Sequence, residues 1–315
     1  MARRRSDPRF NAEARPPMID YDPHSWLSHL FDIKGSMVRE IMGRVLACVA
    51  WSALVVTFAK YVSDVVVIPT TIHSLVGVAL GLLLVFRTNV SYERYWEGRR
   101  MWGSIINASR DLGRATATHL AGDPTRRDAV MDWIAAFAHA AVVVLRGGSG
   151  LGPSAARLPG PEVAAVLASR SVPLAVASRI GDELAAARDE GRISDVLLAH
   201  LDLDVRQLID CLGGCDRIKK TPMPFAYVVH LRRALILYCF TLPFGLVKDY
   251  GWGTVLDTLL ISYVFFGVEE IGVEIENPFG DDDNDLPIER FAELIAGDLD
   301  GLRKPAVSGR APGSS

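Results

Sequence analysis

The chain has 315 residues, with 34 Lys and Arg against 37 Asp and Glu and a formal net charge of −3. Its mean hydropathy of +0.20 is high for a soluble cytosolic protein and excludes a chain that is disordered throughout. The near balance of charge argues against nucleic acid as a partner, because nucleic-acid-binding proteins carry a basic excess. The four cysteines have neither the spacing of a disulfide framework nor that of a zinc site.

The N-terminal part of the chain predicts a leader followed by a membrane hairpin. Residues 1–17 are basic but precede no apolar segment, so we expect a disordered leader and not a secretory signal. Residues 18–86 hold the N-terminal segment and the first transmembrane hairpin, with spans near 38–62 and 65–86. The second span has no formal charge over 22 residues, which is long enough to cross a hydrocarbon core of about 30 Å.

Residues 87–226 predict a helical cytosolic domain. Within it, residues 129–146 are strongly apolar, but only 13 residues between Asp132 and Arg146 lack a charge. That length is too short for a crossing, so we expect a buried core helix. Periodicity predicts two further amphipathic helices, near 162–192 and 194–218.

The C-terminal part predicts a second hairpin and a cytosolic end. Residues 227–271 hold two shorter apolar segments, predicted as spans near 229–248 and 252–270. Residues 272–300 predict an acidic cytosolic segment and a helix, and the Gly/Pro/Ser-rich residues 301–315 predict a disordered tail.

Lys and Arg flank these spans asymmetrically. The two hairpin loops carry only Lys60 and Lys248, whereas basic residues cluster before the first span, after the second and before the third. The positive-inside rule therefore predicts that both termini and the middle segment are cytoplasmic. The predicted fold class is an all-α membrane protein with four transmembrane helices per subunit and a helical cytosolic domain.

One helical face of the second span carries the small residues Thr70, Ser74, Gly77 and Gly81. Small residues let helix backbones approach closely in lipid. The pattern indicates either ordinary helix packing or a helix that packs around a pore. His73, in the middle of the predicted span, is a functional candidate or a hydrogen-bonded neutral imidazole.

Four stretches of sequence resemble the bestrophin family in its bacterial branch. In chain order they are MIDYDPHSW (18–26), FRTNVSYERYWEGRRMWG (86–103), TPMPFAY (221–227) and IENPFGDDDNDLP (275–287). The residues taken as the family motif are Arg87, Tyr92, Arg94, Tyr95, Trp96, Asn277, Pro278, Phe279 and Gly280.

This resemblance implies a homopentameric ion channel of the bacterial inner membrane. The channel is expected to conduct ions passively, with anions such as chloride as the first expectation. Its partners would be further copies of the chain, membrane lipid and small inorganic ions. Because some bacterial relatives conduct cations, a sodium-selective channel of the same fold is an alternative.

The resemblance also implies a pore neck formed by three apolar rings of the second helix, each one turn apart. Counted back from Arg87, these rings fall at Thr71, Leu75 and Ala79. Thr71 and Ala79 are smaller than the Ile or Phe of the family, so we expect either a wider, wetter neck or a shifted register.

A second family constriction, at the cytosolic mouth, falls at Thr221 when Pro224 and Tyr227 are matched to the family's Pro-x-x-Tyr. The alternative is that residues 221–224 are only a proline-punctuated start of the third span. The adjacent lysines would either attract anions or serve as positive flanks of the membrane.

The acidic run at 281–285 offers oxygen ligands of the kind that hard cations prefer. By family position, a calcium ion would use Asp282 and Asp285. The alternative is an acidic turn before a helix near Ile288, and we otherwise expect no cofactor.

Two non-channel interpretations remain for these residues. The run at 281–285 also fits the DDxxD pattern of a magnesium-dependent intramembrane prenyl transferase, although a second facing acidic cluster is missing. A non-conducting membrane scaffold would explain the helices without a permeant ion. Since neither a nucleophile elbow nor a phosphate-binding glycine loop is present, we expect no enzyme activity.

Overall fold

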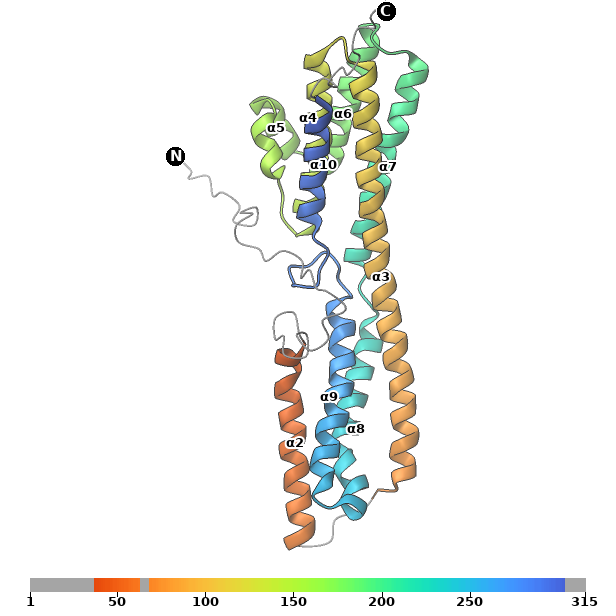
Figure 1. The fold of residues 1–315 in the computed structure, drawn as a ribbon, viewed down its shortest axis with the longest axis vertical. Coiled ribbons are helices and arrows are strands. Elements are labelled where there is room, and N and C mark those ends of the chain that lie inside the picture. Colours follow the sequence, from red (N-terminus) through yellow and green to blue (C-terminus); the bar gives the residue numbers. More distant parts are fainter. Residues whose placement is uncertain (1–36, 63–67, 304–315) are drawn as a thin grey trace, which may run out of the picture.

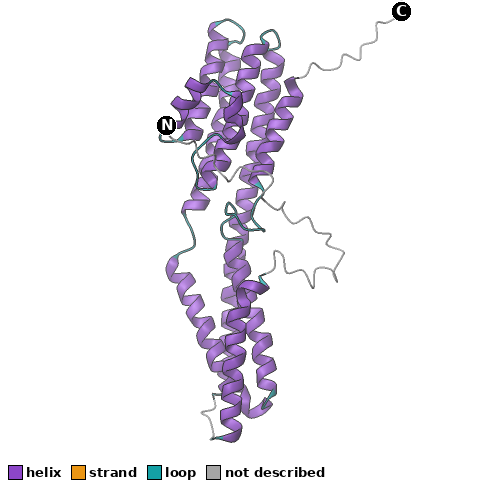
Figure 2. Cartoon of the chain, turned by 90° about the vertical axis from the view of Figure 1, so that its left-hand side faces the viewer, coloured by secondary structure: helices purple, strands orange, loops and turns teal. Residues whose placement is uncertain are grey.

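The computed structural model describes residues 37–62 and 68–303. The predicted leader, most of the N-terminal segment, the first hairpin loop and almost all of the predicted tail lie outside these residues. Figure 2 shows helices and loops but no strand in the part described, which confirms the all-α prediction. The molecule is elongated, with a membrane bundle at one end and a second helical bundle at the other (Figure 1).

The membrane bundle consists of α2 (Val38–Tyr61), the first half of α3 (Thr70–His119), α8 (Phe225–Tyr250) and α9 (Gly253–Glu274). Helices α8 and α9 lie between α2 and α3 (Figure 1). Gly251 makes the tight turn from α8 to α9 with φ +51°, a conformation that glycine adopts without strain. The structure thus has a helix at each of the four predicted spans.

Helix α3 is continuous over 50 residues, a length of about 75 Å. The sequence places a boundary between the first hairpin and the cytosolic domain at 86/87, yet the helix passes through it without a break. Neither glycine nor proline interrupts residues 82–97, so nothing in the local sequence ends the helix there. The two bundles consequently share one rigid element.

The second bundle contains one central helix, α4 (Pro124–Leu145), surrounded by α5 (Gly160–Leu167), α6 (Val172–Asp189), α7 (Asp195–Lys220) and α10 (Ile288–Arg303), with a short 3₁₀ turn at Gly152–Arg157. The long helix predicted over 162–192 is two helices, because the chain turns at 168–171.

Helix α4 is long and apolar enough to cross a membrane, as are α2, α3 and α8. Burial distinguishes it from them: 78% of its apolar segment is buried, against 22–28% for the other three. The sequence-based prediction of a core helix at 129–146 is thus confirmed. Helix α9 has only 11 uncharged residues between Asp257 and Glu269, but it lies beside α8 in the membrane bundle (Figure 1).

Candidate functional site

The membrane half of α3 has one buried face and one exposed face. His73, Leu80 and Leu84 are buried against α8 and α9, with 8%, 3% and 2% of their surface exposed. His73 is the fourth residue of α3, so it lies near the far end of the span and not in its middle as the sequence suggested. Its Nε2 pairs with Thr241 Oγ1 at 3.1 Å.

The three predicted neck residues all lie outside this buried face. Leu75 is 74% exposed in the single subunit, and Thr71 and Ala79 are exposed as well. No other element of the described chain covers them. Their place in a pore stays a prediction.

Three larger apolar residues continue the same exposed face and were not singled out from the sequence. Val78, Leu82 and Phe86 are 73%, 56% and 55% exposed and follow one another at i, i+4 and i+8. The signal that could have found them is the bulky, one-turn spacing that ends next to Arg87, since the resemblance implies bulky rings. Each of them is seven residues beyond the matching member of the predicted set and so differs from it by only about 20° around the helix axis.

Arg87 of the family motif marks the level at which α3 leaves the membrane bundle, here called the waist. Its side chain is 1% exposed, and its Nη2 lies 3.9 Å from Glu269 and 3.6 Å from Glu276. Glu269, itself 2% exposed, also pairs with Arg232 at 2.9 Å and with Arg44 at 3.5 Å. A buried guanidinium is tolerated only where carboxylates compensate it, so this network ties all four membrane helices together.

Arg94, two turns further along α3, donates three hydrogen bonds to backbone carbonyl groups at the waist. Its Nε donates to Glu276 O at 3.0 Å, Nη1 to Thr221 O at 2.5 Å and Nη2 to Ile218 O at 2.7 Å. The fixed fork of a guanidinium suits this task, because it can satisfy several carbonyls at once. Arg94 therefore joins α3 to the C-terminus of α7 and to the end of α9.

The turn at 277–280 packs directly on α3. A Cβ at Gly98 would lie 2.9 Å from Phe279 Cζ and 3.2 Å from Pro278 Cγ, so only a glycine permits this approach. Phe279 is 1% exposed. The structure thus brings the family-like stretches 86–103 and 275–287 into contact.

The aromatic residues of the motif divide between the two sides of α3. Tyr95 is partly buried, and burial together with nearby Asp285 raises the pKa of its hydroxyl. Tyr92 and Trp96 are 58% and 51% exposed and point away from the subunit core. Aromatic rings at this level suit a membrane–water boundary.

Thr221, the predicted aperture residue, is exposed at the junction between α7 and α8. Its neighbours have structural partners: Lys219 Nζ donates to Val144 O at 3.1 Å and Leu145 O at 2.7 Å, and Lys220 pairs with Asp216 at 2.6 Å. Burial lowers the pKa of Lys219. At the far end of α7, Val196 is 81% exposed.

The two residues predicted as calcium ligands differ in environment. Asp285 is 5% exposed, and its Oδ2 accepts the Asp282 N–H at 2.8 Å. Burial raises the pKa of the Asp285 carboxyl to about 6. Asp282 is exposed, and no group of three or more metal-ligating side chains is found in the described ranges 37–62 and 68–303. These residues alone do not fit a calcium site, whereas Asp285 does close the turn that precedes α10.

Comparison with known proteins identifies the family of the chain. Residues 18–300 match the sequence model of the family described as Bacterial/Fungal Bestrophin protein. The chain belongs to this family. A voltage-dependent anion channel-forming protein of Nostoc sp. is 37% identical over 282 residues, which is 88% of this chain and 91% of the relative. The protein of that name from Escherichia coli, YneE, is 35% identical over 283 residues, with coverage of 90% and 93%.

The bestrophin fold is also found in solved structures. The crystal structure of a bacterial bestrophin homologue from Klebsiella pneumoniae superimposes with a TM-score of 0.79 at 30% identity, over 84% of this chain and 98% of that chain. The fold is therefore that of a bestrophin, as the sequence resemblance implied.

Proposed function

We propose that this bestrophin is a homopentameric channel that passively conducts anions such as chloride across the bacterial inner membrane. The relatives whose names describe channel formation align with nearly the whole chain, which supports carrying the activity over. It also disfavours the scaffold and the prenyl transferase. The membrane bundle of apolar helices makes the chain an integral membrane protein.

The observation that carries the proposal is the exposed face of α3. Its members are Thr71, Leu75, Val78, Leu82 and Phe86. From the first to the last they span about 22 Å, most of a hydrocarbon core. Copies of α3 placed around an axis would cover this face and enclose a path between them.

Side-chain size along this face predicts where the path narrows. Leu75, Leu82 and Phe86 carry the largest side chains and would form the narrow rings, whereas Thr71, Val78 and Ala79 would leave the path wider. None of these side chains is charged, so ring size and ease of wetting set the barrier to an ion. This arrangement is expected to select weakly among anions.

The distribution of Lys and Arg supports one orientation in the membrane. The helical bundle that holds α4 to α7 continues from the basic flank of the membrane helices, so we infer that it is cytoplasmic together with both termini. Thr221 is proposed as a second constriction on that side, and we propose that conduction needs no bound cofactor. Calcium chelation should leave the current unchanged; a current that disappears with chelation would contradict this part.

A test of the path uses cysteine substitution during current recording. Leu82→Cys should be blocked by a charged, water-soluble methanethiosulfonate, because a pore residue contacts water. Leu256→Cys is the matched control, since Leu256 on α9 is 68% exposed in the subunit but belongs to a different face. Block at Leu256 with no effect at Leu82 would refute the proposed path.

One observation favours cations as the second candidate. Glu93 continues the exposed face two turns beyond Phe86, and no ion pair is recorded for it within the described part of the chain. A ring of such carboxylates below the neck would attract sodium. Glu93→Gln should then shift the reversal potential towards that of chloride, whereas an anion channel would show little change.

A further inference from the structure

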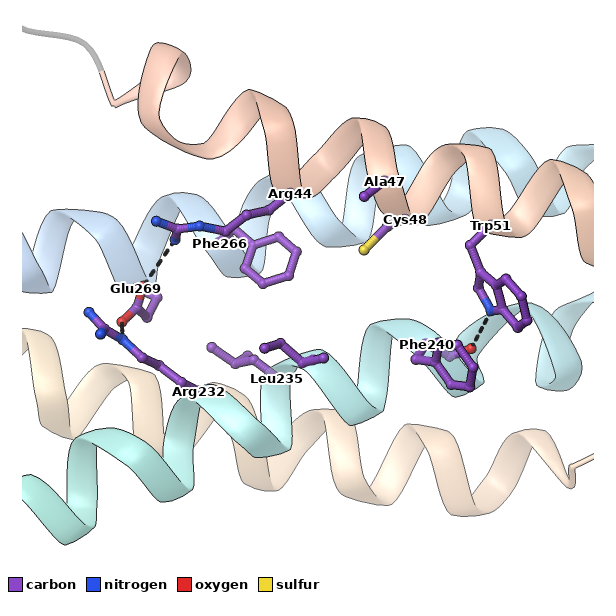
Figure 3. Close-up of a pocket in the computed structure, with 10 residues that line it drawn as sticks. Arg44, Ala47, Cys48, Trp51, Arg232, Leu235, Phe240, Phe266 and Glu269 are labelled. Carbon is purple, nitrogen blue, oxygen red and sulfur yellow. Dashed lines mark hydrogen bonds and ion pairs between the residues drawn. The ribbon is translucent and has the colours of Figure 1, made fainter.

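A groove lies between α2 and α8, with α9 as its floor (Figure 3). Its volume is about 470 Å³, which is the size of a small-molecule pocket. From Arg44 to Trp51 it runs about 10 Å along α2. No step of the proposed ion path uses it.

The half of the groove nearer the membrane centre is apolar. Leu235 and Phe266 form buried walls with 1% and 5% exposure. Trp51 stacks on Phe240 with ring centroids 4.5 Å apart and closes this end, while its Nε1 donates to Phe240 O at 2.9 Å. Binding of an acyl chain here would be favourable, because the chain would cover exposed apolar surface.

The half nearer the waist is cationic and fixed in place. Arg44 and Arg232 are 45% and 50% exposed and flank the buried Glu269 (Figure 3). Arg232 uses Nε for Glu269, and Arg44 uses Nη1 for Glu269 and Glu270. No partner among the described residues is recorded for the Arg232 Nη atoms or for Arg44 Nη2, so both guanidinium groups keep donors for another acceptor.

We propose that this groove binds one anionic phospholipid per subunit, with an acyl chain along the apolar half and the phosphate on Arg44 and Arg232. Arginine recognises a phosphate through paired hydrogen bonds, which suits two half-exposed guanidiniums held at a fixed spacing. Their level also fits, because Arg44 lies about 9 Å from the start of α2, near the membrane face that carries the helical domain.

The position of the groove favours a lipid over another subunit. Helices α8 and α9 separate α2 from α3 (Figure 1). If the exposed face of α3 surrounds the pore, α2 lies at the periphery of the oligomer, where lipid is the solvent. This step rests on the proposed channel architecture.

The experiment is native mass spectrometry of the full-length oligomer incubated with phosphatidylglycerol or with phosphatidylcholine. We expect retention of phosphatidylglycerol up to one per subunit, roughly tenfold above phosphatidylcholine, as a charge-assisted phosphate contact allows. Ala47→Trp, which fills the groove from an exposed lining position, should reduce phosphatidylglycerol to the phosphatidylcholine level. Ala50→Trp, exposed on α2 but outside the groove, should retain it. Arg232→Lys keeps the charge and should give partial loss.

Four results would overturn the proposal. Equal retention of the two lipids would show that the site does not select an anionic headgroup. Equal retention of phosphatidylglycerol by Ala47→Trp and wild type would show that the lipid binds outside the groove. If Ala47→Trp dissociates the oligomer and Ala50→Trp does not, the groove is a contact between subunits. If inorganic phosphate displaces the lipid completely, the groove is a site for free anions. Chloride flux measured on the same wild-type preparation separates this test from the channel proposal, since lipid retention and flux can fail independently.

Discussion

Replacing Arg87 by Gln tests whether the buried charge network holds the waist together. The substitution removes the one cation that lies between Glu269 and Glu276, at 3.9 Å and 3.6 Å. Glu276 would keep the Met223 N–H at 2.9 Å. Glu269 would keep Arg232 and Arg44, so the damage is smaller than the loss of every partner.

The magnitude follows from this inventory. Removing one member of a fully buried ion pair costs about 3–5 kcal/mol. Because Glu269 retains two cations, we expect the lower end, about 3 kcal/mol. For a chain of this size that corresponds to a fall in melting temperature of about 6 °C.

The assay is thermal unfolding of the purified oligomer in detergent, followed by intrinsic fluorescence. Arg114→Gln is the matched control, because Arg114 is 67% exposed and its pair with Asp111 spans 3.8 Å at the surface, so the change should be within about 1 kcal/mol. Melting of Arg87→Gln within one degree of wild type (a shift no larger than that of the control) would refute the reasoning.

Three further predictions concern the neck, the waist and the acidic turn. Leu82→Ala should raise single-channel conductance roughly twofold by widening an apolar ring; an unchanged conductance would remove Leu82 from the pore. Gly98→Ala should lower the melting temperature, because its Cβ would lie 2.9 Å from Phe279, an overpacking cost of about 1–3 kcal/mol, whereas Gly181→Ala meets nothing within 4 Å and should not. Asp285 binds its proton more tightly in the folded state, with a pKa of about 6, so its stabilising effect is lost as pH rises from about 4 through 6. Asp285→Asn should therefore flatten the fall in melting temperature over that range, and an equally steep fall in the variant would contradict the assignment.

Much of the fold could be predicted because hydropathy and charge are local signals. The uncharged length of the second span predicted a membrane crossing, whereas the shorter uncharged length at 129–146 predicted a core helix. The low burial of the first and the high burial of the second agree with these predictions. The continuity of α3 was not predicted, because the change from apolar to charged residues at Arg87 alters composition without altering helical periodicity.

The site was less accessible to sequence reasoning for a geometric reason. On a helix, Leu75 and Leu82 are seven residues apart and differ by only about 20° around the axis, so spacing alone does not choose between the two registers. The partners of Arg87 lie some 180 residues away in sequence, at Glu269 and Glu276. The groove between Arg44 and Arg232 forms only when α2 and α8 lie side by side, so the sequence pattern of either helix alone does not predict it.

The most direct test of the central claim is the reversal potential of the reconstituted protein in a planar bilayer under a sodium chloride gradient. The account predicts a current whose reversal potential lies on the chloride side of zero. A reversal potential at the sodium equilibrium value would contradict anion conduction, and a membrane that stays silent with the oligomer present would contradict the channel itself.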